Sequence, residues 1–243
     1  MESLREVLTE ADRNRVAVGH FNFSEVAAFN AIVAAARNLR VPVMLGVSEG
    51  EREFFGVAQA AAIIRSVRES DGLSIYLNAD HTHSIEKAEA AARAGFDEII
   101  FDGSAKPLEE NIADTKRAVE AIKPINSSIL VEGEIGYIGA SSEILDKPPE
   151  GMTLTTPEEA RQFVAETGVN VLAPAVGNMH GARRKRQTPR SRSNCHYQAG
   201  GQNTDDPARR LGHRQRRFPS RDQGRDDYCT RQYRVAACMA AQP

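Results

Sequence analysis

The sequence predicts an α/β fold, a (βα)8 TIM barrel that is incomplete and has six βα units. Short apolar runs alternate with segments of helical spacing, at intervals of roughly 25–30 residues, as parallel βα units do. Several runs, such as 41–48, are apolar throughout, which is typical of strands covered on both faces. A doubly wound sheet would give the same alternation, but no glycine-rich dinucleotide fingerprint follows the first strand.

The elements are expected in a regular order after a short amphipathic helix over 1–15. Strands are expected over 16–23, 41–48, 73–77, 98–104, 128–136 and 169–177. Helices are expected from residue 24, over 54–69, 84–94 and 107–122, and from residue 157. Ser24 and Ser84 are predicted as N-caps and Gly95 as a C-cap. Thr156, Pro157 and Glu159 form a strong helix start, with a cap, a proline at the first position and an acid.

Charge divides the chain into two parts. Residues 1–181 contain 16 Lys and Arg against 28 Asp and Glu, whereas residues 182–243 contain 15 against 5. All three cysteines lie in the second part. A basic arm that binds nucleic acid is one interpretation of that part. No apolar run is long enough to span a membrane and no signal peptide is present, so the expectation is a cytoplasmic protein that contacts no membrane.

Polar residues occupy the carboxyl ends of the expected strands. They are Asn22, Ser48, Asp80 with His81, Asp102, Glu134 and His180. In a barrel these ends share one face, and that face carries the active site. Two His, two Asp and one Glu form a ligand set suited to zinc or a similar ion. The alternative for Asp80 and His81 is a turn with a solvated imidazole and a capping carboxylate.

Five segments carry a family resemblance. They are Phe21-Asn22-Phe23, Asn78-Ala79-Asp80-His81, Phe101-Asp102-Gly103-Ser104, Glu132-Gly133-Glu134-Ile135-Gly136 and Ala173-Pro174-Ala175-Val176-Gly177-Asn178-Met179-His180-Gly181. In this order and spacing they resemble the class II, zinc-dependent fructose-bisphosphate and tagatose-bisphosphate aldolases, over about residues 5–181. The resemblance implies a lyase that cleaves a phosphorylated ketose, a ketose bisphosphate, reversibly to dihydroxyacetone phosphate and an aldehyde. It also implies a homo-oligomer. No nucleic-acid partner is expected, because the basic part has a single Lys and shows neither aromatic nor helical spacing.

The same resemblance implies metal ligands and a proton carrier. His81 and His180 match two of the three histidines that bind the catalytic Zn²⁺. Asp80 matches the acid/base that exchanges a proton with the substrate hydroxyl. Glu134 and Asp102 match residues that hold an alternative metal position or a second divalent or monovalent cation.

Further positions are implied to contact substrate. Asn22 and Ser48 match the substrate-binding ends of strands one and two. Gly181 matches a glycine whose backbone helps to hold a phosphate. Glu143 lies on the loop where the family keeps a mobile carboxylate base.

The resemblance stops after Gly181. The family's third zinc histidine, in a His-Gly-Gly-Ser-Gly stretch, has no counterpart, and His196 and His213 have different surroundings. We therefore interpret 1–181 as a partial aldolase barrel and 182–243 as a non-homologous, disordered tail produced by a frame change in the coding sequence. Activity of this chain is expected to be absent or very low. The alternatives are an α/β protein with a nucleic-acid-binding arm and a structural or regulatory barrel without metal.

Overall fold

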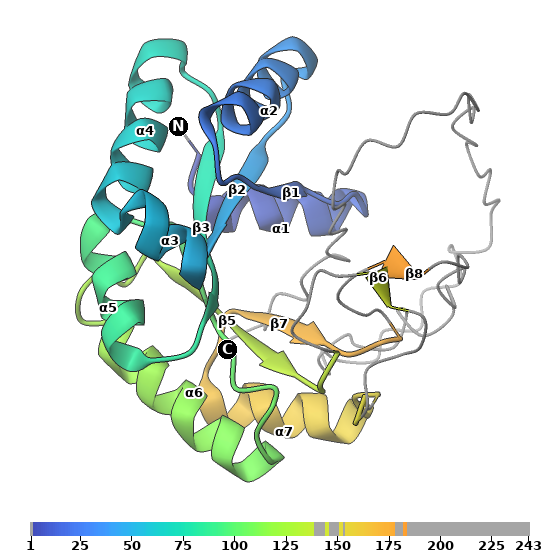
Figure 1. Ribbon diagram of the computed structural model, residues 1–243. Coiled ribbons are helices and arrows are strands. Elements are labelled where there is room, and N and C mark those ends of the chain that lie inside the picture. The colour runs from blue at the N-terminus through green and yellow to red at the C-terminus, as the bar shows by residue number, and fades with distance from the viewer. Residues whose placement is uncertain (1, 139–143, 146–150, 153, 178–181, 184–243) are drawn as a thin grey trace, which may run out of the picture.

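The described part of the chain is built around a curled parallel sheet (Figure 1). A computed structural model describes residues 2–138, 144–145, 151–152, 154–177 and 182–183. The six strands of the sheet pair in the order β1 (Gly19–Asn22), β2 (Val43–Ser48), β3 (Ile75–Thr82), β4 (Glu98–Phe101), β5 (Leu130–Ile135) and β7 (Val171–Pro174). A separate parallel pair joins β6 (Ile144–Leu145) to β8 (Ala182–Arg183).

One helix precedes the large sheet in the chain, and the others connect its strands. They are α1 (Leu4–Asn14), α2 (Val26–Leu39), α3 (Glu49–Phe55), α4 (Val57–Asp71), α5 (Ile85–Ala94), α6 (Leu108–Ile122) and α7 (Pro157–Thr167). Neighbouring strands are parallel, and each strand before β7 is followed by a crossover that contains a helix, as the alternation in the sequence predicts. The predicted fold class is confirmed for this part: six parallel strands alternating with helices form a curled, partial barrel, although in the described residues no helix follows β7.

Two apolar clusters hold the sheet in place. The larger lies between the sheet and the outer helices and includes Leu45, Ile99 and Phe163. The smaller lies on the inner side, where Leu4 and Val7 of α1 pack against side chains that include Tyr76. Burying each such aliphatic side chain stabilises the fold by about 1.5–3 kcal/mol. Helix α1 therefore closes one end of the curled sheet and leaves the carboxyl ends of the strands at the other.

Most of the helix ends are as predicted. Ser84 caps α5, Gly95 ends it in a left-handed conformation, and Thr156 with Glu159 forms a complete capping box on α7. Ser24 was predicted as an N-cap, but this is wrong: α2 begins after Glu25, which makes no side-chain capping bond.

The single helix expected over 54–69 is also wrong, because two helices occupy this region. Helix α3 begins directly after β2, with Ser48 and Glu51 as a capping box, and Gly56 separates it from α4. Gly56 has a φ of 96°, a conformation that L side chains rarely adopt. The chain therefore turns here and starts a new helix.

Within the described residues, every helix is too short or too polar to cross a membrane. The proposed tail, 182–243, lies outside the described residues except for β8. Its expected disorder stays a prediction.

Candidate metal centre and active site

A β-bulge in β3 brings Asp80 and His81 to the same face of the sheet. Three residue steps on β3, from Ala79 to Thr82, match two steps on β4, from Ile99 to Phe101. His81 has a φ of 44°, in the left-handed region. In a regular strand neighbouring side chains alternate between faces, but an extra residue re-aims one of them. Both side chains therefore point toward the inner carboxyl-terminal end of the sheet.

Asp80 is held by a residue from the edge strand. Its side chain is buried, and its Oδ2 accepts a hydrogen bond of 2.8 Å from Nδ2 of Asn22, the last residue of β1. Gly46 of β2 lies between them, and a Cβ there would come within 2.3 Å of the Asn22 amide oxygen and of His20 Nε2. The absence of a side chain at position 46 thus allows β1 to reach across β2 to Asp80.

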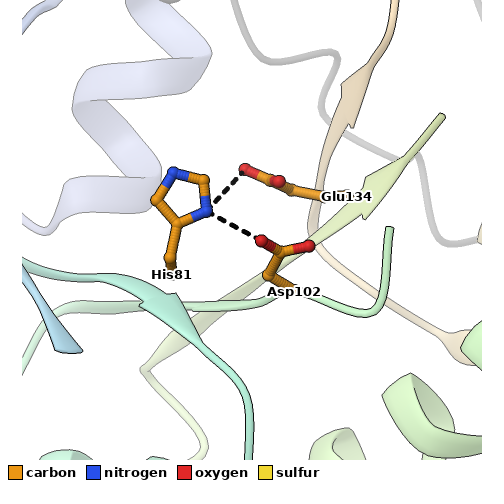
Figure 2. Close-up of side chains that lie close together, drawn as sticks. All are labelled: His81, Asp102 and Glu134. Carbon is orange, nitrogen blue, oxygen red and sulfur yellow. Dashed lines mark hydrogen bonds and ion pairs between the residues drawn. The ribbon is translucent and has the colours of Figure 1, made fainter. Parts of the chain in front are cut away.

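His81 faces two carboxylates from the next two strands (Figure 2). Its Nδ1 lies 2.9 Å from Oδ2 of Asp102, just past β4, and 3.6 Å from Oε1 of Glu134 on β5. Its Nε2 lies 3.9 Å from Oδ1 of Asp80. The imidazole therefore stands among three carboxylates at the ends of three adjacent strands.

The charges of this cluster shift two pKa values. Burial opposes protonation of His81, but the hydrogen bond to Asp102 and the charges of Glu134 and Asp80 outweigh it and raise the pKa of His81 to about 9. Burial alone would raise the pKa of Asp102, but hydrogen bonds from His81 and Ser104 lower it overall. The metal-free site at neutral pH thus holds an imidazolium next to an ionised Asp102.

Two further polar residues support Asp102 and Glu134. Oδ1 of Asp102 accepts hydrogen bonds from the backbone N–H (2.9 Å) and the hydroxyl (2.6 Å) of Ser104, so its Oδ2 is directed at His81. Asn111, buried on α6, donates to the backbone carbonyl of Glu134 at 2.8 Å and accepts from Thr115. Hydrogen bonds therefore orient the carboxylate of Asp102 directly, whereas Asn111 fixes the backbone that carries Glu134.

The donor set fits a divalent metal ion. His81, Asp102 and Glu134 each offer one ligand atom, and these atoms lie within 4.8 Å of one another. Ligands on a tetrahedral zinc ion, with bonds of about 2.1 Å, stand roughly 3.4 Å apart, which is close to the distances from Nδ1 to the two carboxylates. A metal ligated by Nδ1 would replace the proton on that nitrogen, so metal binding and protonation compete at His81.

The structure brings together five of the nine residues predicted for the site: Asn22, Asp80, His81, Asp102 and Glu134. Ser48 lies at the end of β2, where its hydroxyl accepts a bond from the N–H of Glu51 and caps α3. The predicted Glu143, His180 and Gly181 lie outside the described residues.

Three residues near the site were not singled out from the sequence: Ser104, Asn111 and Arg52. Ser104 follows Asp102 by two positions, a spacing typical of a turn in which an Asp side chain accepts from the backbone. For Asn111 and Arg52 the signal is absent from the local sequence, because both act on residues brought close only by the fold.

Comparison with known proteins identifies the class. The family model for class-II fructose-bisphosphate aldolase matches residues 2–195. The chain therefore belongs to the class II fructose-bisphosphate aldolase family, and the resemblance seen in the five sequence segments is confirmed. The match runs past Gly181, where the sequence segments end, into the first residues of the basic part.

Individual relatives agree with the family assignment. A fructose-bisphosphate aldolase of Geobacillus stearothermophilus is 36% identical over 182 residues, which are 74% of this chain and 62% of the relative. A probable fructose-bisphosphate aldolase of Bacillus subtilis is 35% identical over 184 residues, with the same coverage. The chain thus spans 62% of the length of the curated relatives it matches.

Two solved structures show the same fold. The YdjI aldolase from Escherichia coli K12 aligns with a TM-score of 0.63 and 27% identity, covering 74% of this chain and 64% of that one. A putative fructose-1,6-biphosphate aldolase from Coccidioides immitis aligns with a TM-score of 0.62 and 32% identity, covering 73% and 62%. The chain thus shares the fold of the larger part of each of these two aldolases.

Proposed function

We propose that this chain carries the metal-binding and proton-transfer part of a class II aldolase, which cleaves a ketose bisphosphate reversibly to dihydroxyacetone phosphate and an aldehyde. One observation supports this most: the bulge in β3 directs Asp80 and His81 to one face, with Asp102 and Glu134 opposite the imidazole. The names of the relatives indicate a fructose bisphosphate as the substrate. Tagatose 1,6-bisphosphate, which the resemblance in the sequence also implies, is the second candidate.

His81, Asp102 and Glu134 would hold the ion, with His180 as a further ligand. A bound divalent cation stabilises the negative charge that develops beside a carbonyl when a carbon–carbon bond breaks. The residues of this chain supply the remaining tasks. Asn22 holds one oxygen of Asp80 and leaves the other directed toward the imidazole side, where a substrate hydroxyl would exchange its proton.

The roles of the other predicted residues also remain proposals. Gly181 would hold a phosphate through its backbone N–H, and Glu143 would act as a mobile base. Asn22 and Ser48 would contact the substrate at the ends of β1 and β2. Three further expectations stay predictions: a second cation, assembly into homo-oligomers and a cytoplasmic location. The comparisons do not favour the alternative of a nucleic-acid-binding protein.

Zinc titration and an aldol-cleavage assay test the central proposal on the full chain. We expect zinc to bind, His81→Ala to weaken zinc binding by at least tenfold, and Asp80→Asn to keep zinc while abolishing cleavage of fructose 1,6-bisphosphate. Cleavage by the unchanged chain should be very slow, so the assay needs high protein concentration. Absence of zinc binding, or cleavage that Asp80→Asn leaves intact, would contradict the proposal.

We also propose that residues 1–181 form the aldolase domain and that a frame change produced 182–243. Codons can be chosen for residues 188–202 and 211–240 such that reading them one nucleotide later spells segments similar to the family's C-terminal third. The nucleotide sequence of the gene tests this directly. A chain expressed from the restored frame should cleave substrate faster by orders of magnitude, and a gene without such an alternative frame would refute the idea.

A further inference from the structure

A buried arginine lies behind the bulge that presents His81. Arg52 belongs to α3, and its side chain is only 3% exposed. Its Nη1 donates to the backbone carbonyl of Asp80 at 3.0 Å and to that of Val47. Its Nη2 donates to the hydroxyl oxygen of Thr82 at 2.8 Å and reaches the carbonyl of His81 at 3.5 Å. The guanidinium thus contacts three consecutive residues of the bulge.

A second residue of α3 extends this attachment by one position. Glu49 accepts a hydrogen bond of 3.0 Å from the backbone N–H of His83 and pairs with Lys87 at 2.6 Å. Each residue from Asp80 to His83 is therefore bonded to α3, through either Arg52 or Glu49. Helix α3 starts directly after β2, so these bonds connect the ends of two adjacent strands.

The bulge needs such support for two physical reasons. A residue other than glycine in the left-handed region is strained and persists there only where the surroundings fix it. A bulge also takes backbone groups out of the regular ladder, and these groups need other partners when they are buried. A guanidinium has five N–H donors in a planar fork, which suits several carbonyl groups that lie close together.

We propose that Arg52 is a positioning residue for the metal centre: it holds the carbonyl groups of Asp80 and His81 and so keeps the imidazole against Asp102 and Glu134. The inference rests on the proposed function in one respect, because the imidazole is taken to be a metal ligand. The hydrogen bonds of Arg52 go to backbone carbonyl groups and to the Thr82 hydroxyl, so Arg52 would act on the site through the backbone of the bulge.

A matched pair of substitutions in the full chain separates positioning from simple stabilisation. Arg52→Lys keeps the charge and the reach but replaces the fork by one ammonium group. Arg68→Lys is the control, because Arg68 anchors the other end of β3: its Nε donates to the carbonyl of Ile75 at 2.6 Å and it pairs with Asp97. Both substitutions remove a guanidinium that holds the backbone of β3, but only Arg52 lies next to the bulge.

Zinc affinity by calorimetry, together with urea unfolding, gives the first measurement. We expect Arg52→Lys to weaken zinc binding by about 10- to 100-fold, the effect typical of residues that orient a metal ligand. Arg68→Lys should change the zinc affinity by less than about twofold, although it lowers stability, because the site geometry is unchanged. A folded Arg52→Lys chain with unchanged zinc affinity would overturn the proposal. If Arg52→Lys does not fold, Thr82→Val takes its place, since it removes one acceptor of Arg52; weaker zinc binding supports the proposal and unchanged binding overturns it.

A second measurement needs no metal and so distinguishes the two proposals. In zinc-free protein with ¹⁵N-labelled histidine, the Nδ1 proton of His81 should give a slowly exchanging signal because it is bonded to Asp102; His81→Gln assigns it. The signal should persist in Arg68→Lys and vanish in Arg52→Lys. A chain that binds no zinc but shows this difference would refute the proposed function and retain the positioning role. A signal equally strong in Arg52→Lys would refute the positioning role alone.

Discussion

Asp80 and His81 are neighbours in the chain, yet their side chains lie on the same face of β3, with Oδ1 and Nε2 3.9 Å apart. A regular strand would place them on opposite faces. The extra residue in β3 opposite β4 removes that restriction. The bulge of β3 thus presents both the carboxylate of Asp80 and the imidazole of His81, and the backbone of the bulge sets the position of both side chains.

The stability of the zinc-free chain should decrease in alkaline solution. The pKa of His81 is raised from 6.5 to about 9, so the folded state binds the proton more tightly than the unfolded state. The contribution of His81 to the free energy of unfolding is fully present below about pH 6.5 and is lost as the pH rises through about 9. It amounts to at most about 3 kcal/mol. Urea unfolding at several pH values between 6 and 10 measures it.

The His81→Gln variant is the control for this pH dependence. It lacks the imidazole at position 81, so its free energy of unfolding should vary less between pH 6.5 and 9 than that of the parent. Asp102, whose pKa is lowered, acts at the other end of the scale: its contribution is present above about pH 4 and is lost as the pH falls. Parallel pH profiles of the two chains in the alkaline range would show that His81 is not the group responsible.

Gly46→Ala should destabilise the protein by about 1–3 kcal/mol, because overpacking a well-filled interior forces neighbours to move. The added Cβ would meet the amide oxygen of Asn22 and Nε2 of His20, each at 2.3 Å. Gly50→Ala is the matched control: it lies in α3 with nothing within 4 Å of its Cβ position, so alanine should stabilise by about 0.5–1 kcal/mol. Thermal unfolding of the two variants tests the contrast, and equal shifts would contradict it.

The sequence predicts the strand ends well because the determinants are local. Apolar runs followed by polar residues mark the carboxyl ends of β3 and β5, and Asp80, His81 and Glu134 lie there as expected. The start of α3 differs from the expected helix over 54–69, although Ser48 and Glu51 have the spacing of a capping box; Gly50 between them is typical of a loop.

The bulge and its supports could not be predicted from local sequence. Whether His81 faces inward depends on the register between β3 and β4, which tertiary packing sets. The burial of Arg52 depends on α3 folding back onto the end of β3. An Arg between two Glu residues, as Arg52 is, ordinarily lies in solvent. Its role is therefore visible only from its backbone partners in the folded chain.

Asn111→Ala should lower the free energy of unfolding by about 1–3 kcal/mol, because it leaves the carbonyl of Glu134 buried without this donor. Thr115→Val is the control, since it removes only the hydroxyl that donates to Asn111 and keeps the bond to Glu134. It should cost about 1 kcal/mol. Urea unfolding compares them, and a Thr115→Val variant that loses more stability than Asn111→Ala would show that the link to Glu134 matters little.

Asn22→Asp tests how the edge strand controls the proton carrier. The Asn22 amide donates to Asp80, and an aspartate at position 22 would replace this donor by a second negative charge at the same distance. Two carboxylates in contact cannot both ionise without a penalty, so the pKa of one of them should rise. The variant should therefore be less stable than the parent at pH 7, and the difference should shrink as the pH falls toward 4, where one carboxylate is protonated.

Asn22→Ala is the control: it removes the donor without adding a charge, so its loss of stability should vary little over this range. If Asn22→Asp and Asn22→Ala showed the same dependence on pH, the side chain of residue 22 would not be close enough to Asp80 to govern its ionisation.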